Sequence, residues 1–234
     1  MENILLPSTI TFLPGSTPAE ATLVIEPFFY GYGRTVGNAL RRVLLSSLSG
    51  AAVTSVKIKG VQHEFTAVTG VLEDALQIIL NLKGLRLKLH SENPVKLTLK
   101  KSGQGPATGA DFEANADVEI MNPDLHIATV TDEKSEFELE VTVGRGRGYS
   151  PTEEREPSGE IGQIAIDSLF SPVRNVGFKV EPTRVGEITD YDKLIMKIET
   201  DGTITPQEAV KQSVAILLDH YNLIAEKLEA PAAE

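Results

Sequence analysis

Three glycines near residue 30 have the residue type and the setting from which nucleotide-binding loops are built. Gly31 and Gly33 follow a predicted strand at 20–26 and precede a predicted helix at 34–48. The third glycine of a dinucleotide loop comes one position too late, at Gly37. The next strand ends in lysines, so no acidic residue is placed to bind a ribose hydroxyl. We interpret the glycines as structural, because glycine is the usual residue of tight turns.

A second candidate for chemistry is the run Gly144–Gly148, in which glycine alternates with Arg145 and Arg147. Glycines free the backbone and guanidinium groups donate forked hydrogen bonds, so such a loop could hold a phosphate or another macromolecule. A flexible hairpin tip with solvated arginines fits the composition equally well. Both interpretations stay open from the sequence.

No other residues assemble a catalytic or metal centre. The four histidines lack ligand spacing, cysteine is absent, and no Gly-x-Ser-x-Gly elbow occurs. The acidic run at 153–156 (EERE) is typical of a solvated loop. We therefore expect no catalytic residue, no metal and no cofactor, and the sequence favours a binding or scaffold role.

The predicted helix at 34–48 carries Arg41 and Arg42 on an otherwise apolar body. A buried helix has little use for adjacent arginines, and a solvated helix has little use for so many leucines. We expect another protein to cover this helix, with the guanidinium groups reaching acceptors on that partner. Charge must be paired where water is excluded, so the arginines would make the contact selective.

The clearest helix is the last, which begins with the capping box Thr205–Glu208 and has Pro206 at its first position. Its apolar residues then follow a 4-3-4-3-4 spacing: Val210, Val214, Leu217, Tyr221, Ile224 and Leu228. This heptad spacing is typical of a helix that packs along another helix. An amphipathic helix on the sheet of its own domain fits the pattern as well. Residues 230–234 indicate the start of a linker.

Between these helices the chain is rich in strands. A helix is predicted at 70–82, and period-two alternation predicts strands from Leu85 to Val143. Further strands are predicted at 53–59, 173–180 and 193–199. We expect an α+β fold of two domains, in which helices pack on an antiparallel sheet and a strand-rich domain is inserted. The discontinuous domain is expected at 1–49 and 171–234, and the inserted domain at 50–170.

Composition agrees with an ordinary globular protein of 234 residues, 41% of them hydrophobic and 24% charged. A formal charge of −11 argues against general nucleic-acid binding, which needs a basic surface. No apolar run approaches the ~20 residues of a membrane span and no leader pattern begins the chain, so a cytoplasmic location is expected.

The run Gly31–Ser47 (GYGRTVGNALRRVLLSS) resembles the signature of the N-terminal domain of bacterial RNA polymerase alpha subunits. The resemblance continues in chain order and covers nearly the whole sequence, through Leu80–Gly84, Arg145–Tyr149, Asp167–Val173, Asp192–Leu194 and Thr200–Ala209.

The resemblance implies a homodimer that forms through two helices and nucleates binding of the beta and beta-prime subunits for DNA-templated transcription. The enzyme would be the whole nucleotidyltransferase complex, found on the nucleoid, and this chain would supply no catalytic residue. Matching positions in the dimer would be Tyr32, Val36, Leu40, Val43, Val210, Val214, Leu217, Tyr221 and Ile224. Matching positions in subunit contacts would be Gly37, Asn38, Arg41, Arg42, Lys83, Arg145, Arg147 and Ile166.

Full-length relatives carry a further domain that binds promoter DNA, so the resemblance assigns no DNA binding to these residues. The acidic loop at 150–160 matches no specific regulator. Two alternatives come from other classes: a nucleotide-dependent enzyme, which NAD or ATP would stabilise, and a nucleic-acid binder with steeply salt-dependent affinity.

Overall fold

The computed structural model describes residues 4–155, 160 and 162–229. The chain divides into two compact units: unit 1 (Met1–Leu48 with Pro172–Glu234) and unit 2 (Ser49–Ser171). The three α-helices and the antiparallel pairing of the described strands agree with the predicted α+β class. The roles predicted for the two domains remain predictions.

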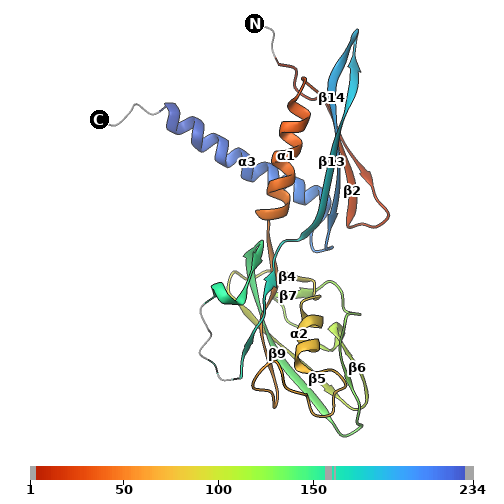
Figure 1. The fold of residues 1–234 in the computed structure, drawn as a ribbon, viewed down its shortest axis with the longest axis vertical. Coiled ribbons are helices and arrows are strands. Elements are labelled where there is room, and N and C mark those ends of the chain that lie inside the picture. Colours follow the sequence, from red (N-terminus) through yellow and green to blue (C-terminus); the bar gives the residue numbers. More distant parts are fainter. Residues whose placement is uncertain (1–3, 156–159, 161, 230–234) are drawn as a thin grey trace, which may run out of the picture. The chain divides into compact units, whose positions relative to one another are not determined.

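Unit 1 is a four-stranded antiparallel sheet in the order β1-β2-β14-β13, with two helices on one face (Figure 1). Its elements are β1 (Thr9–Pro14), β2 (Glu20–Phe28), α1 (Tyr32–Ser46), β13 (Val173–Val185), β14 (Ile188–Thr200) and α3 (Pro206–Glu229). Apolar residues that alternate along β2 and β14 face the helices and form the core with them, among them Leu23, Ile25, Leu40, Leu44, Leu194, Met196, Ile198, Ala209 and Val210.

Helix α1 lies very close to the sheet, and two glycines make this possible. A Cβ atom on Gly37 would lie 2.8 Å from Leu194 Cδ1 and 2.8 Å from Phe178 Cδ2. A Cβ atom on Gly33 would lie 2.9 Å from the Cβ of Asp192. The sheet therefore occupies the space that a nucleotide would need, so the structural interpretation of these glycines is the correct one.

Helix α1 begins and ends two residues before the predicted 34–48. Gly31 adopts a left-handed conformation (φ 83°) that turns the chain directly into the helix at Tyr32. The helix ends where the Ser46 hydroxyl donates to the Arg42 carbonyl and Ser47 N donates to the Val43 carbonyl. The local turn chemistry, rather than the apolar spacing, sets both ends.

The strands of unit 1 are longer than predicted. Strand β2 runs past Pro27, because the pairing with β1 stops at Glu26 and the register against β14 shifts at this point. Proline therefore removes no hydrogen bond from either ladder. Strands β13 and β14 continue well beyond 180 and 193, and they form a hairpin whose turn contains Gly186 in the left-handed conformation (φ 63°).

Unit 2 is built on a sheet in the order β5-β9-β3-β4-β7, with β11 also paired to β3 and with short β6-β8 and β10-β12 pairs. Its elements are β3 (Ser49–Ile58), α2 (Ala75–Leu82), β4 (Leu87–Leu89), β5 (Val95–Ser102), β6 (Gly105–Thr108), η1 (Gly109–Asp111), β7 (Val118–Ile120), β8 (His126–Val130), β9 (Glu136–Arg147), β10 (Tyr149–Ser150), η2 (Thr152–Glu154), β11 (Ile164–Ala165) and β12 (Ser168–Leu169).

Helix α2 is shorter than the predicted 70–82. The preceding residues pair with β8 instead, since Leu72 N donates to the Thr129 carbonyl at 2.9 Å. Asp74 then caps the helix by accepting from Gln77 N at 2.8 Å. The predicted end at Lys83-Gly84 is confirmed, with Gly84 N donating to the Asn81 carbonyl.

We predict that Gly37→Val lowers the free energy of unfolding by about 2 kcal/mol, because the new side chain collides with Leu194 and Phe178. Gly177→Val is the matched control, since nothing lies within 4 Å of a Cβ at that position of β13. Urea denaturation of both variants checks this. Equal stability of the two variants would show that α1 can move away from the sheet without cost.

Candidate protein–protein interface

Two of the sequence motifs meet at the surface of unit 2. Lys83 Nζ lies 3.2 Å from Asp167 Oδ2, and Thr152 N donates to Asp167 Oδ1 at 2.9 Å. The hydrogen bond from Thr152 and then that from Lys83 lower the pKa of the Asp167 carboxyl. The adjacent Ile166 is only 1% exposed, so the prediction that it contacts another subunit is wrong: its side chain belongs to the core of unit 2.

The run Gly144–Gly148 is not a flexible hairpin tip, which corrects that interpretation, whereas a contact of its arginines with another macromolecule stays a prediction. Its first four residues continue β9, in which Arg145 pairs with Ala51 and Arg147 pairs with Ser49, and the strand ends before Gly148, which is left-handed (φ 62°). Its glycines are needed for close packing, because a Cβ on Gly146 would lie 2.6 Å from the ring of Phe170. Both arginines are exposed, and Arg145 Nη2 also donates to the Leu89 carbonyl at 2.9 Å.

Arg155 is a residue that sequence reasoning missed, because it lies in the acidic run interpreted as a solvated loop. Its guanidinium is half-buried and donates to the carbonyls of Ser150, Ile166 and Thr54 at 2.6, 2.8 and 3.2 Å. It also donates to the hydroxyl of Ser168, which in turn donates to the Val53 carbonyl at 2.7 Å. The only hint of this role in the sequence is that Arg155 is a single arginine among the glutamates of 153–156. The network attaches the segment that carries Asp167 to β3.

Glu73 forms a second polar cluster on unit 2. Its carboxylate accepts from Thr129 N at 2.6 Å and from the Thr129 hydroxyl at 3.0 Å, and it lies 2.8 Å from His126 Nε2. Burial alone would raise the pKa of Glu73, but the hydrogen bonds from His126 and Thr129 together lower it. The cluster fixes the segment before α2 on β8, a structural role.

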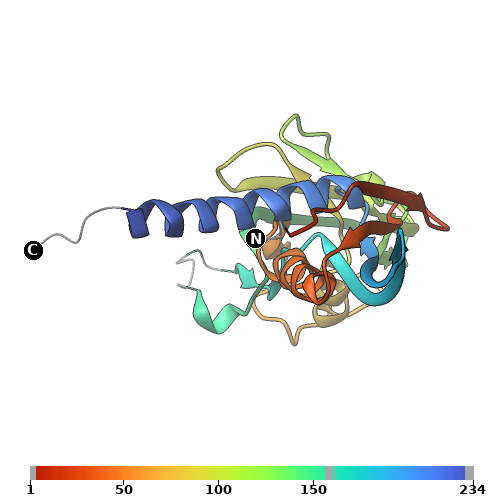
Figure 2. The same cartoon turned by 90° about the horizontal axis from the view of Figure 1, so that it is seen from above.

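In unit 1 a line of exposed apolar residues lies on α3. Ala209, Val210 and Ser213 are buried where α3 packs on α1 and the sheet, whereas every described residue after Leu217 is exposed. The second half of the helix extends beyond its own sheet (Figure 2). One side of it forms the α3 stripe, with exposed fractions of 40, 53, 60, 55 and 82% for Val214, Leu218, Tyr221, Ile224 and Leu228.

The α3 stripe differs from the predicted heptad. Val210 belongs to the core of unit 1 and Leu217 packs against it, so these two residues are turned toward the core that the sheet and α1 share. The alternative of an amphipathic helix on its own domain therefore holds for the first half of α3. The exposed line passes through Leu218 instead of Leu217. The capping box is confirmed, since Glu208 N donates to the Thr205 hydroxyl at 3.2 Å.

The two arginines of α1 have different surroundings. Arg41 Nε donates to the Val176 carbonyl at 3.0 Å, so this guanidinium is already engaged by β13. Arg42 is exposed, and its guanidinium makes no hydrogen bond or ion pair to any residue that the structure describes. Leu40, predicted to lie in the dimer, is 3% exposed and faces the core, which corrects that assignment.

The remaining predicted positions of α1 are divided between the two faces. Gly37 is buried against the sheet, so only its neighbour Asn38 is exposed for a subunit contact. Val36 and Val43 are half-buried, and Tyr32 is exposed. Tyr32 makes an edge-to-face contact with Phe29, their centroids 6.3 Å apart.

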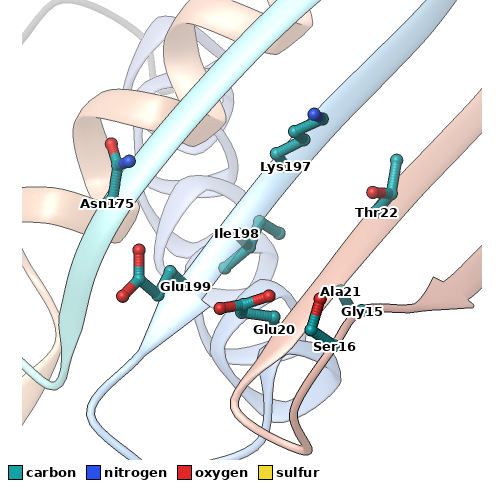
Figure 3. A pocket seen from close by; sticks show the side chains of 9 residues that line it. All are labelled: Gly15, Ser16, Glu20, Ala21, Thr22, Asn175, Lys197, Ile198 and Glu199. Carbon is teal, nitrogen blue, oxygen red and sulfur yellow. The ribbon is translucent and has the colours of Figure 1, made fainter.

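A pocket of about 350 Å³ lies on the other face of the unit 1 sheet, where Glu20 and Glu199 are direct cross-strand partners (Figure 3). Thr22, Lys197 and Asn175 also line it. Among the described residues no group of three or more His, Cys, Asp or Glu side chains is arranged to hold a metal ion. The pocket is polar and presents no nucleophile paired with a base.

The comparison with known families decides the class of the protein. Residues 56–171 match the family model described as the RNA polymerase Rpb3/RpoA insert domain. The chain belongs to the RNA polymerase alpha subunit family. It is therefore a polymerase subunit, and the complex that such subunits form is a nucleotidyltransferase.

Within this alpha-type chain the matched segment coincides closely with unit 2 and includes Lys83, Arg145, Arg155 and Asp167. Helices α1 and α3 lie outside the match, so their role has to be argued from their surfaces. None of the helices in the described part of the chain is long and apolar enough to cross a membrane.

We predict that Glu73→Gln lowers the free energy of unfolding by about 1–2 kcal/mol at pH 7, because a charged acceptor of three hydrogen bonds is lost. The folded-state pKa of Glu73 is lowered, so its contribution is present above the ordinary value of 4.5 and is lost as the pH falls below it. The two proteins should therefore converge in stability toward pH 3, as measured by urea unfolding. Glu119→Gln, at an exposed position of β7, is the control. A difference that is still present in full at pH 3 would contradict the assignment.

Proposed function

We propose that this chain is a non-catalytic assembly scaffold of bacterial RNA polymerase. It forms a homodimer and nucleates binding of the beta and beta-prime subunits, in the cytoplasm and on the nucleoid. Membership of the alpha subunit family supports a place in the polymerase. The apolar surfaces of its helices support a role in assembly.

The observation that carries the proposal is the α3 stripe. Soluble monomers rarely expose a contiguous apolar line of this length on one helix. Its residues are spaced three and four apart, the spacing at which two helices interdigitate. A second copy of the chain presents the same stripe, so a two-fold axis allows the stripe to be buried against itself.

Arg42 supports a second contact on α1. Its free guanidinium stands on the exposed side of a helix whose other side is committed to the sheet. A carboxylate or carbonyl on a large subunit would complete its hydrogen bonds. Two identical protomers facing two different subunits must use such surfaces differently, so we assign Arg42 to capture of beta.

Unit 2 adds a contact surface around Lys83. Leu76 and Leu80 on α2 and the preceding Leu72 are exposed, and they follow one another at intervals of four residues. They adjoin Lys83 in sequence, while Asp167 holds the lysine in place. We propose this surface as one contact for the large subunits, and the exposed Arg145 and Arg147 of β9 as another.

We predict that Tyr221→Asp converts the dimer into monomers, because a charge without a partner in a dry helix contact costs several kcal/mol. The position is exposed within the protomer, so the fold itself should be retained. Sedimentation velocity measures the change, and circular dichroism checks the fold. Gln212→Asp places the same charge at an exposed position on the side of α3 opposite the stripe and should leave the dimer intact. Dimers of unchanged affinity in Tyr221→Asp would refute the stripe as the interface.

We predict that Arg42→Glu abolishes capture of the beta subunit and leaves the dimer unchanged, because the reversed charge repels the acceptors that the guanidinium meets. A pull-down with purified beta measures capture. Lys134→Glu, at an exposed position of unit 2, changes the net charge by the same amount and serves as the control. Capture at the wild-type level by Arg42→Glu would show that α1 does not hold beta through this residue.

A further inference from the structure

Helix α1 begins without any cap from its own sequence. A local cap requires a residue with extended backbone and a side-chain oxygen just before the helix. That place is taken by Gly31, which is left-handed and has no side chain. The first turn of the helix also contains no acidic residue. Tyr32 N donates to the Phe29 carbonyl and Thr35 N to the Gly31 carbonyl, so the amides of the first turn that need an acceptor from elsewhere are those of Gly33 and Arg34.

The acceptor comes from β14. Asp192 Oδ2 accepts a hydrogen bond from Gly33 N at 3.1 Å, across 159 positions of sequence. Asp192 lies where the register of β14 against β2 shifts, which places it opposite the start of the helix. A carboxylate at this end of a helix is also stabilised by the helix dipole.

Gly33 has the geometry that this contact needs. A Cβ atom at this position would lie 2.9 Å from the Cβ of Asp192, 3.1 Å from its Oδ2 and 3.2 Å from Val180 Cγ1. Any larger residue would push the carboxylate away from the amide. The motif that begins at Gly31 and the motif that begins at Asp192 therefore contact each other where α1 meets the sheet.

We infer that Asp192 is a positioning residue for α1. Its carboxylate holds the first turn of the helix on β14, so it fixes the placement of Arg42 about two and a half turns further on. The consequence for capture of beta rests on the proposed function, whereas the consequence for the helix does not.

The helix arm of the test compares Asp192→Ala, Asp192→Asn and Asp190→Ala in the full chain. Asp190 is the matched control, since it is exposed on the same strand. Hydrogen exchange of the Gly33 amide should be about fivefold faster in Asp192→Ala, the effect of losing one cap, while the amides of Val43–Ser46 stay unchanged. Asp192→Asn should remain near wild type, because an amide oxygen also accepts. Asp192→Ser, whose side chain is too short to reach, replaces the alanine variant if that variant does not fold.

The binding arm measures the Kd for purified beta in the same variants, with Arg42→Glu as reference. Asp192→Ala should bind about fivefold more weakly, and Asp192→Asn should restore binding, a rescue that general loss of stability would not produce. Unchanged exchange at Gly33 overturns the inference. Normal capture by Asp192→Ala overturns the positioning role if Arg42→Glu loses capture. Normal capture by Arg42→Glu overturns the proposed function instead, and the exchange result then decides the inference.

Discussion

The close approach of α1 to the β13–β14 hairpin is the constraint on which unit 1 depends. Gly37 and Gly33 bring the helix backbone to a distance at which any added Cβ would collide with the sheet. The inner side of α1 is thereby committed to the core, and Arg41 is held by the carbonyl of Val176. The outer side, with Arg42, is left for another molecule. Packing within the protomer thus defines which part of the helix is available for assembly.

Helix α3 also packs on its own core and offers a surface for assembly, but it does so with its first and second halves, not with two opposite faces. Its first half supplies Ala209 and Val210 to the core, and its second half extends past the sheet with the α3 stripe uncovered. Apolar area that stays in water does not stabilise the protomer. It stabilises the folded protein only when a second surface covers it. The stability of such a protein is linked to protomer concentration, since association stabilises the folded chain.

Unit 2 is stabilised in a different way around its contact surface. Arg155 Nη1 donates to the Thr54 carbonyl of β3, while its Nη2 donates to the carbonyls of Ser150 and Ile166, so one guanidinium connects three parts of the backbone. A buried donor is stabilising only when its acceptors are in place, so such a network specifies one arrangement of the backbone. That arrangement places Asp167 against Lys83 and gives the surface a defined charge pattern.

The sequence by itself determined what depends on residues within about one turn of one another. The capping box at Thr205, the alternation along β5 and β9, and the end of α2 at Gly84 are of this kind, because each is a pattern of residues close together in the sequence. The family signature also lies in local motifs. The tertiary structure alone decided the start of α2, the burial of Leu40 and Ile166, the strand conformation of Gly144–Arg147, and the roles of Arg155 and Asp192. Each of these depends on a partner tens to more than a hundred residues away, and no local spacing records which segments the fold will bring together.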